Sequence, residues 1–303
     1  MLSFFIGIAV TVLTVTLLIT GFFRTRRRMP FPPYGWFGIM ALAAAELLMF
    51  RGIEPVATYF TPIAWSCYIL IADAAVFAVT GRSRLHDAPL TLARMALLSI
   101  PLWLIFEAYN LRLCNWVYVG VPAGWPVALI GYGWSFATIT PAIFETSDLV
   151  QALLPVLPGE PRKVPGAAEA AIMICGAACL VLPLVLPQSI AAHLFALVWV
   201  GFVLLLDPLN RRLGLPSFLG DLSEGFLRRI HGFFLAGWIC GWLWEFWNYW
   251  AHAKWHYTFP MFQRWKIFEM PAPGYLGFFP FALECFAMYV TAAWLVGWLK
   301  RVK

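Results

Sequence analysis

Long apolar runs separated by short basic loops constrain this chain more than any other feature. A helix needs about 20 apolar residues to cross a bilayer, and nine runs approach or exceed that length: residues 3–23, 35–52, 57–80, 91–111, 129–156, 168–187, 190–208, 228–250 and 273–298. Only 12% of the residues are charged, against about 25% in an ordinary soluble domain. We therefore expect an all-α polytopic integral membrane protein with about nine transmembrane helices.

The basic residues predict the orientation of these helices. The first run has no basic segment before it and no cleavage site after it, so it reads as an uncleaved anchor. If the N-terminus lies outside, the cytoplasmic loops are the ones rich in Arg and Lys, as the positive-inside rule requires, with Lys254, Arg264 and Lys266 as exceptions. We expect a prokaryotic inner-membrane protein with a cytoplasmic C-terminus. The net charge of +6 then reflects topology, and no nucleic-acid partner is expected.

Eight residues of the first half recur in the same order in the second half. They are Trp65, Asp73, Glu107, Asn110, Trp116, Tyr118, Pro141 and Glu145, matched by Trp199, Asp207, Glu245, Asn248, Trp255, Tyr257, Pro280 and Glu284. The offset is 134 for the first two pairs, 138 for the next two and 139 for the last four. Two small length changes thus align the whole set, which indicates an internal duplication.

The duplication divides the chain into four parts. Residues 1–34 form an N-terminal transmembrane anchor with a basic loop, 35–156 a first four-helix repeat, 157–167 a linker, and 168–303 a second four-helix repeat. An even number of spans leaves both copies in the same orientation. We therefore expect parallel repeats related by a pseudo-two-fold axis along the membrane normal.

The matched carboxyl and amide groups are the candidate catalytic residues. A carboxylate at the centre of a membrane helix costs about 2.5 to 3.5 kcal/mol on the translocon scale, and such groups usually face a cavity or a partner. The candidates are Glu107, Asn110, Glu145, Glu245, Asn248 and Glu284. In each Glu-x-x-Asn pair the two side chains share a helix face, so the amide could hold the carboxyl in either protonation state. The alternative is a polar link between helices, worth only about 0.6 kcal/mol on average.

The remaining acidic residues of the apolar runs are weaker candidates for a functional site. Asp73 and Asp207 lie near the cytoplasmic ends of their spans, where a local cap or salt bridge explains them as well as chemistry does. Glu46 has no counterpart in the second copy. We expect the two aspartates to be structural and leave Glu46 outside the site.

Glycine and proline interrupt the last span of each copy. Gly131, Gly133 and Pro141 stand in the first copy, and Gly274, Gly277 and Pro280 in the second. This composition favours broken or re-entrant helices. Irregular backbone at membrane depth is tolerated only where it is buried or lines a cavity, so each matched glutamate, four residues beyond the proline, is expected near a cavity at mid-depth.

The two Trp-x-Tyr elements are the candidate substrate-binding residues. Trp116 with Tyr118 and Trp255 with Tyr257 follow the two Glu-x-x-Asn pairs. Their aromatic rings either belong to the interfacial belt of the membrane or line a cavity, where ring faces stabilise a cation. A carboxylic acid beside such a cavity could protonate an alkene and hold the resulting carbocation.

No metal or cofactor is expected. His252 and His256 could join Glu245 and Asn248 near one face, but the first copy has no histidine at the matching positions. The six cysteines lie in or near apolar runs, where cysteine behaves mostly as a small hydrophobe. No phosphate loop, nucleophile elbow or dinucleotide fingerprint is present.

The tandem order of an acidic residue, Trp-x-Tyr and a proline shortly before a glutamate resembles the integral-membrane lycopene cyclase family. That family includes heterodimeric bacterial carotenoid cyclases and their fused archaeal and fungal forms. The similarity covers residues of about 100–150 and 240–290. It implies cofactor-free, acid-catalysed cyclisation or isomerisation of an isoprenoid, with the matched carboxyls as proton donor and acceptor.

Three functions remain open at this point. The chain is an enzyme that acts by acid-base chemistry on an apolar isoprenoid or other membrane lipid, an ion- or proton-coupled transporter with parallel repeats, or a non-catalytic subunit of a membrane complex. A single apolar cavity that opens to lipid would favour the enzyme. An aqueous path to one side would favour the transporter.

Overall fold

The computed structural model describes residues 2–155 and 159–298. The first residues of the expected linker and the C-terminal Lys300, Arg301 and Lys303 lie outside these ranges. The described chain is 73% helical, with strands confined to two short two-stranded ribbons. The all-α expectation is confirmed.

Nine helices of the described chain have 18 or more residues: α1 (Leu2–Arg24), α2 (Pro33–Phe50), α3 (Phe60–Thr80), α5 (Pro89–Leu113), α6 (Trp125–Leu153), α7 (Gly166–Val185), α9 (Phe195–Arg212), α11 (Arg228–Trp250) and α12 (Phe278–Leu295). Seven segments are long and apolar enough to span a membrane, which indicates a membrane-embedded protein. Helices α9 and α11 fall short of that measure. Helix α9 carries the charged residues Asp207, Arg211 and Arg212, and α11 is rich in tryptophan and includes Glu245 and Asn248. The count of nine spans stays a prediction.

Short elements connect the long helices. They are α4 (Arg84–Asp87), α8 (Gln188–Ala191), α10 (Phe218–Glu224), the 3-10 helix η1 (Ala272–Gly277), and the strands β1 (Trp116–Val119), β2 (Lys254–Tyr257), β3 (Lys266–Ile267) and β4 (Met270–Pro271). Helices α4 and α10 occupy matching places after α3 and α9. The two halves of the chain thus share most of their order of elements.

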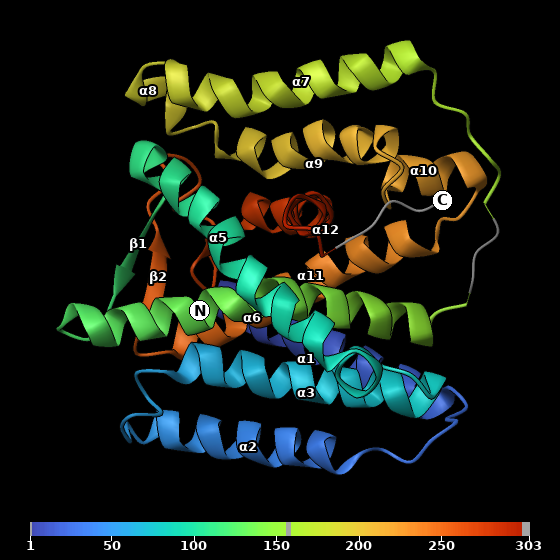
Figure 1. The fold of residues 1–303 in the computed structure, drawn as a ribbon. Helices are drawn as coiled ribbons and strands as arrows, with labels where there is room; N and C mark the ends of the chain where they lie inside the picture. Colours follow the sequence, from blue (N-terminus) through green and yellow to red (C-terminus); the bar gives the residue numbers. More distant parts are fainter. Residues whose placement is uncertain (1, 156–158, 299–303) are drawn as a thin grey trace.

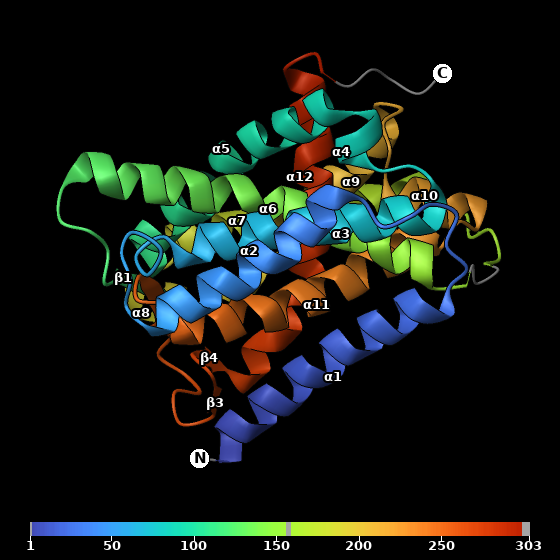
Figure 2. The same ribbon diagram turned by 90° about the horizontal axis from the view of Figure 1, so that it is seen from below.

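The helices form stacked rows (Figure 1). Helices α2 and α3 lie side by side at one edge, and α7 and α9 at the opposite edge, with α6 and α11 between them. Helix α12 is seen end-on in Figure 1 and runs across these rows in Figure 2. Its counterpart α6 is seen side-on, so the last helices of the two copies differ in direction.

Glycines allow α7 and α9 to approach closely. A Cβ added at Gly176 of α7 would lie 2.5 Å from the backbone nitrogen of Leu205 in α9, and one at Gly201 of α9 would lie 2.6 Å from the Leu180 side chain. Small residues at a helix crossing permit this approach in membranes, where packing rather than water exclusion holds helices together.

The Trp-x-Tyr elements of the two copies pair with each other. Strands β1 and β2 are antiparallel, with Trp116 opposite Tyr257 and Tyr118 opposite Trp255. If each residue is replaced by the residue that matches it in the other copy, the same two cross-strand pairs result. The pairing of the ribbon therefore has two-fold symmetry, and it joins the two halves of the chain.

The expectation of a broken helix is wrong for both copies. Helix α6 continues from Trp125 to Leu153 through Gly131, Gly133 and Pro141. The Ser99 hydroxyl of α5 donates to the Phe136 carbonyl (2.5 Å) and accepts from the Thr140 N–H (3.0 Å), which supports the helix just before the proline. In the second copy the glycines lie in η1, and α12 begins after it. There too the helix runs on without a break, with 3-10 geometry from Ala272 to Gly277 and α-helical geometry from Phe278.

Candidate functional site

A cavity of about 150 Å³ lies at the meeting point of the two halves. Its lining is mostly aromatic and comes from both copies, including Trp65, Trp103, Trp116, Tyr118, Tyr132 and Phe136 from the first, and Phe195, Trp199, Trp244, Trp255, Tyr257, Phe278 and Phe281 from the second. All four predicted substrate-binding residues are in this set. The matched pair Trp65 and Trp199 is there as well.

The strand period places these rings together. Residues two apart on a strand point to the same face, so Trp116 and Tyr118 of β1 share a face, as do Trp255 and Tyr257 of β2. Because the two strands pair in register, the four rings form one aromatic surface over the cavity.

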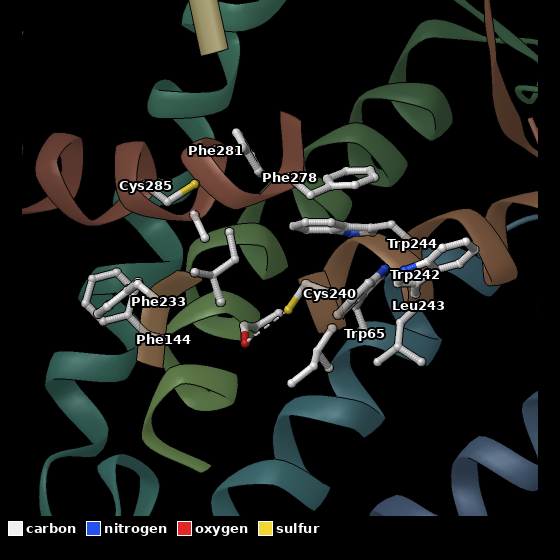
Figure 3. Packing of buried hydrophobic residues seen from close by; sticks show 14 of the residues in the cluster. Trp65, Phe144, Phe233, Cys240, Trp242, Leu243, Trp244, Phe278, Phe281 and Cys285 are labelled. Carbon is white, nitrogen blue, oxygen red and sulfur yellow. Dashed lines mark hydrogen bonds between the residues drawn. The ribbon is translucent and has the colours of Figure 1, made fainter. Parts of the chain in front are cut away.

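Large rings from three helices form the buried side of the cavity (Figure 3). The centroid of Trp244 in α11 lies 4.9 Å from that of Trp65 in α3, and 6.1 and 5.8 Å from those of Phe278 and Phe281 in α12. Aromatic pairs at these separations add to the stability of apolar packing. A pre-formed, water-excluding wall results.

Glu107 lies directly behind this surface. Its Oε1 accepts hydrogen bonds from Tyr118 Oη (2.5 Å), Trp103 Nε1 (2.8 Å) and Trp116 Nε1 (3.3 Å). All three donors line the cavity. An ionised carboxylate only accepts hydrogen bonds, so three converging donors suit the charged form.

Glu245 has a different environment at the matching place. It is fully buried, and its Oε1 accepts one hydrogen bond, from Tyr257 Oη at 2.8 Å. Its Oε2 has no hydrogen-bond partner in the described part of the chain. An isolated buried charge is costly, so this environment suits the neutral carboxylic acid.

Both tyrosines of the pairs keep their protons. Burial, followed by the neighbouring glutamate, raises the pKa of Tyr118 and of Tyr257 well above the usual 10.0. Each hydroxyl therefore stands as a neutral donor between a carboxyl group and the cavity.

Asn110 and Asn248 form hydrogen bonds with backbone groups and not with the carboxyl groups of the glutamates. Asn248 Nδ2 donates to the Trp255 carbonyl and its Oδ1 accepts from the Trp255 N–H, both at 2.9 Å. Asn110 bonds Trp116 in the same way, at 2.9 and 3.1 Å. Instead of setting the state of the glutamate three residues earlier, as the sequence suggested, each amide clamps the tryptophan of its own Trp-x-Tyr element.

Glu145 lies away from the cavity, near the short helix α4. It is fully buried, and neither oxygen has a hydrogen-bond partner among the described residues. Its Oε1 is 3.9 Å from Arg84 Nε, which lies 2.8 Å from Asp148 Oδ2. The carboxyl therefore belongs to a charged cluster beside the loop that follows α3.

Glu284 also lies away from the cavity lining. It is fully buried in α12, and its Oε1 accepts from the backbone N–H of Phe202 in α9 at 2.8 Å. The four glutamates therefore do not converge. Two reach the aromatic cavity through tyrosines, and two support contacts elsewhere.

The matched aspartates anchor the short helices α4 and α10. Asp73 accepts from Tyr34 Oη (2.7 Å), Ser83 Oγ (2.8 Å) and the Leu85 N–H (2.8 Å). Asp207 accepts from the N–H groups of Phe218 (2.6 Å) and Leu219 (2.9 Å). Helix N-termini present unpaired N–H groups that acidic side chains satisfy, so the structural interpretation of both aspartates fits these contacts.

Two serines that cap these short helices were not predicted from the sequence. Ser83 caps α4 and Ser217 caps α10, each accepting from a backbone N–H three residues later. Both stand in a Ser-x-Leu-x-Asp pattern at the same offset of 134 as the aspartates. That shared offset is the signal that could have found them.

His252 is exposed, and His256 Nδ1 lies 2.8 Å from Glu269 Oε2. Across residues 2–155 and 159–298, no group of three or more His, Cys, Asp or Glu side chains is placed to hold a metal ion. The site offers proton-transfer groups and aromatic faces to a ligand.

No protein-family model, curated protein or solved structure matches this chain.

Proposed function

We propose that this protein is a membrane enzyme that isomerises or cyclises the apolar end of an isoprenoid lipid by acid-base chemistry. One observation carries the proposal: two Glu–Tyr pairs, Glu107 with Tyr118 and Glu245 with Tyr257, reach one aromatic cavity shared by both halves. The resemblance to the lycopene cyclase family supports the choice of an isoprenoid.

The cavity size favours an end group over a whole lipid. An apolar cavity of about 150 Å³ accommodates a molecule of about the size of benzene, whereas pockets for whole drug-sized ligands span about 300–1,000 Å³. A cavity of this volume holds one ring or the last isoprene unit of a chain. The rest of the lipid then lies outside the cavity.

The different surroundings of the two glutamates assign their roles. Glu245, buried with one unpartnered oxygen, is the proton donor. Glu107, with three donors on one oxygen, is the acceptor. Pairs of carboxyl groups whose environments favour opposite protonation states are typical of acid-base sites.

The proton moves through the tyrosines, because they line the cavity and the glutamates do not. The Tyr257 hydroxyl, which donates to Glu245 in the resting site, first turns towards the cavity. The protonated Glu245 carboxyl then passes its proton to Tyr257 Oη as the Tyr257 hydroxyl proton bonds to an alkene carbon. The resulting carbocation then loses a proton to Tyr118 Oη while the Tyr118 hydroxyl proton passes to Glu107. The lipid gains and loses one proton, so its mass is unchanged, and exchange with water restores both carboxyls.

The aromatic wall stabilises the cation between these steps. The faces of Trp, Tyr and Phe attract positive charge, by about 2 kcal/mol or more per contact when water is absent. Besides the tyrosines, the polar side chains of the lining are Thr58, Thr61, Ser135 and Lys254. The Lys254 ammonium is held by the Tyr249 carbonyl and lies 3.9 Å from Glu269 Oε1, so a polar solute would find few free partners. The cavity is therefore better suited to an apolar substrate than to the cargo of a polar-solute carrier.

Deuterium uptake tests the proposal directly. The purified protein would be incubated in heavy water with squalene, lycopene and geranylgeraniol in turn, and each recovered lipid analysed by mass spectrometry. We expect deuterium in the lipid that is the substrate. Glu245→Gln and Glu107→Gln should each slow its uptake by about 10²- to 10⁴-fold, the usual contribution of general acid-base catalysis.

The control variants are Glu145→Gln and Glu284→Gln, because these buried glutamates lie away from the cavity. Folded protein of either variant should retain the uptake rate. Absence of deuterium from every lipid, or equal rates in wild type and Glu245→Gln, would refute the assignment.

A further inference from the structure

The exposure of the lining residues locates the mouth of the cavity. Phe136, Trp199, Trp244, Phe278 and Phe281 are buried and close the inner side. Most of the half-exposed lining residues come from the residues before and at the start of α3, the loop after β1, the N-terminal half of α6, and β2; Trp103 of α5 and Tyr118 of β1 are half-exposed as well. The cavity therefore opens between the beginning of α3 and the beginning of α6.

This mouth is bordered by a lipid-compatible surface. Trp125, Leu129 and Ile130 in the N-terminal half of α6 are 78%, 61% and 62% exposed. Large exposed apolar groups on a membrane-embedded helix match the hydrocarbon phase. The same half-helix lines the cavity with Ala128, Gly131, Tyr132 and Ser135, so it separates the cavity from lipid.

Few polar contacts hold this wall against α3. Tyr59 Oη donates to the Val127 carbonyl at 3.1 Å, and Trp134 Nε1 donates to Ser66 Oγ at 3.0 Å. The Tyr59 ring also lies against Gly131, where an added Cβ would meet it at 3.3 Å. Tyr59 is therefore the residue that closes the gap between the two helices.

A weak point of α6 lies directly behind the wall. Thr140 N–H and the Phe136 carbonyl, which form one rung of a regular α-helix, both bond the Ser99 hydroxyl. Pro141 has no N–H for the next rung. A side chain inserted in the ladder and a proline are the usual causes of bending in a helix.

The second copy changes from 3-10 to α-helical geometry at the corresponding place. At the offset of 139, residues 133–138 of α6 correspond to η1, Ala272–Gly277. The residues before η1 form the β3–β4 ribbon rather than a helix. The matched segments thus have different backbone arrangements on the N-terminal side of this point. In the first copy the segment is part of the long helix α6, and in the second it is a β ribbon followed by a 3-10 helix.

From these observations we infer that the lipid enters the cavity sideways from the bilayer, between α3 and the N-terminal half of α6. This half-helix moves about the Ser99 contact, and Tyr59 closes the gap. The inference rests on the proposed function, since it assumes that the cavity receives an apolar chain. It adds the path of that chain and the residues that control its passage.

Two glycines on the same turn of α6 provide a matched pair of variants. Gly131 lines the cavity and faces Tyr59, whereas a Cβ at Gly133 would meet no atom within 4 Å. Gly131→Leu fills the gap and Gly133→Leu does not. Both changes raise helix propensity by about the same amount, so a difference in labelling rate between the two variants is due to the filling of the gap.

Tyr59→Phe gives a change of opposite sign. It removes the hydrogen bond to the Val127 carbonyl and leaves the ring in place. Entry and exit of the chain should both become faster, with the occupancy at equilibrium unchanged.

The probe is geranylgeraniol with a diazirine on its last isoprene unit, added to the protein in lipid nanodiscs. Flash illumination at successive times, followed by peptide mass spectrometry, gives the rate at which cavity peptides become labelled. We expect Gly131→Leu to slow labelling by about tenfold or more, since a tenfold change requires only about 1.4 kcal/mol of added barrier. Gly133→Leu should match wild type, and Tyr59→Phe should exceed it.

The outcomes separate the two proposals. Labelling of the wild-type cavity with equal rates in Gly131→Leu and Gly133→Leu, and no acceleration in Tyr59→Phe, would overturn the path and leave the proposed function standing. No labelling of the wild-type cavity at any time would overturn both.

Discussion

The clamp between Asn248 and Trp255 can be broken by replacing one side chain. Asn248 is fully buried, and its amide bonds both the N–H and the carbonyl of Trp255. Each hydrogen bond contributes about 1 kcal/mol, and a buried polar group left unpaired costs about 1–3 kcal/mol. Asn248→Leu should therefore lower the free energy of unfolding by about 2–4 kcal/mol.

Asn248→Asp tests the geometry more closely. The carboxyl retains an acceptor for the Trp255 N–H, but its ionised form places an acceptor against the Trp255 carbonyl, where the amide donates. Only the protonated acid restores a donor. The variant should therefore be less stable than wild type near neutral pH and regain stability as the pH falls towards about 4, the usual range of aspartate.

Denaturant titration in detergent micelles, followed by tryptophan fluorescence, measures these changes. Gln263→Glu is the control, because it makes the same chemical change at an exposed side chain. The clamp is refuted if Asn248→Leu changes stability by less than about 0.5 kcal/mol, the range of ordinary surface substitutions.

A double variant with Glu245→Gln separates the clamp from a direct action on the carboxyl. If Asn248 acts only on the Trp255 backbone, the stability effects of the two changes should add within about 0.5 kcal/mol. A coupling energy above about 1 kcal/mol would instead show that the amide acts on Glu245, as the sequence alone suggested.

Three further predictions concern the framework. Asp207→Ala should lower stability by about 1–2 kcal/mol in thermal or denaturant unfolding, because the first N–H groups of α10 lose their acceptor; an unchanged midpoint would contradict this. Gly176→Ala should prevent the close approach of α7 and α9 and lower stability, whereas Gly166→Ala, which meets open space, should not; size-exclusion profiles and unfolding midpoints compare the two. Burial raises the pKa of Asp221 to about 6 although Arg229 opposes the shift, so the folded protein binds this proton more tightly and stability should fall as the pH rises from about 4 to about 6. Asp221→Asn should make that slope shallower in unfolding measurements across this pH range.

Sequence patterns predicted the positions of the helices well, because hydrophobicity along the chain indicates a helix without knowledge of its neighbours. Apolar runs located all nine long helices, and seven segments are long and apolar enough to span a membrane. Helix α6 was predicted less well, since Gly131, Gly133 and Pro141 are breakers by propensity. A hydroxyl from another helix, Ser99, supports the backbone there, and that contact depends on packing between α5 and α6.

The candidate site was predicted in part. Matched spacing selected the Trp-x-Tyr elements and Glu107 with Glu245. The structure brings the four rings to one cavity and places each glutamate behind them, hydrogen-bonded to a tyrosine. Spacing could not show that β1 and β2 pair with each other, since the strands lie more than a hundred residues apart. Nor could it show that Glu145 faces Arg84, because the direction of a helix face is set by the packing of its neighbours.

The pairing of β1 with β2 bears on how a protein of this shape could be assembled. A strand that pairs antiparallel with its own duplicate, Trp against Tyr and Tyr against Trp, would also pair with the same strand of a second identical chain. Such self-complementary contacts are the hallmark of two-fold homodimers. A single four-helix unit could thus form the aromatic surface as a dimer with two equivalent Glu–Tyr pairs. In a single chain the two matched positions can differ, and here Glu107 accepts from three donors whereas one oxygen of Glu245 has no partner in the described part of the chain.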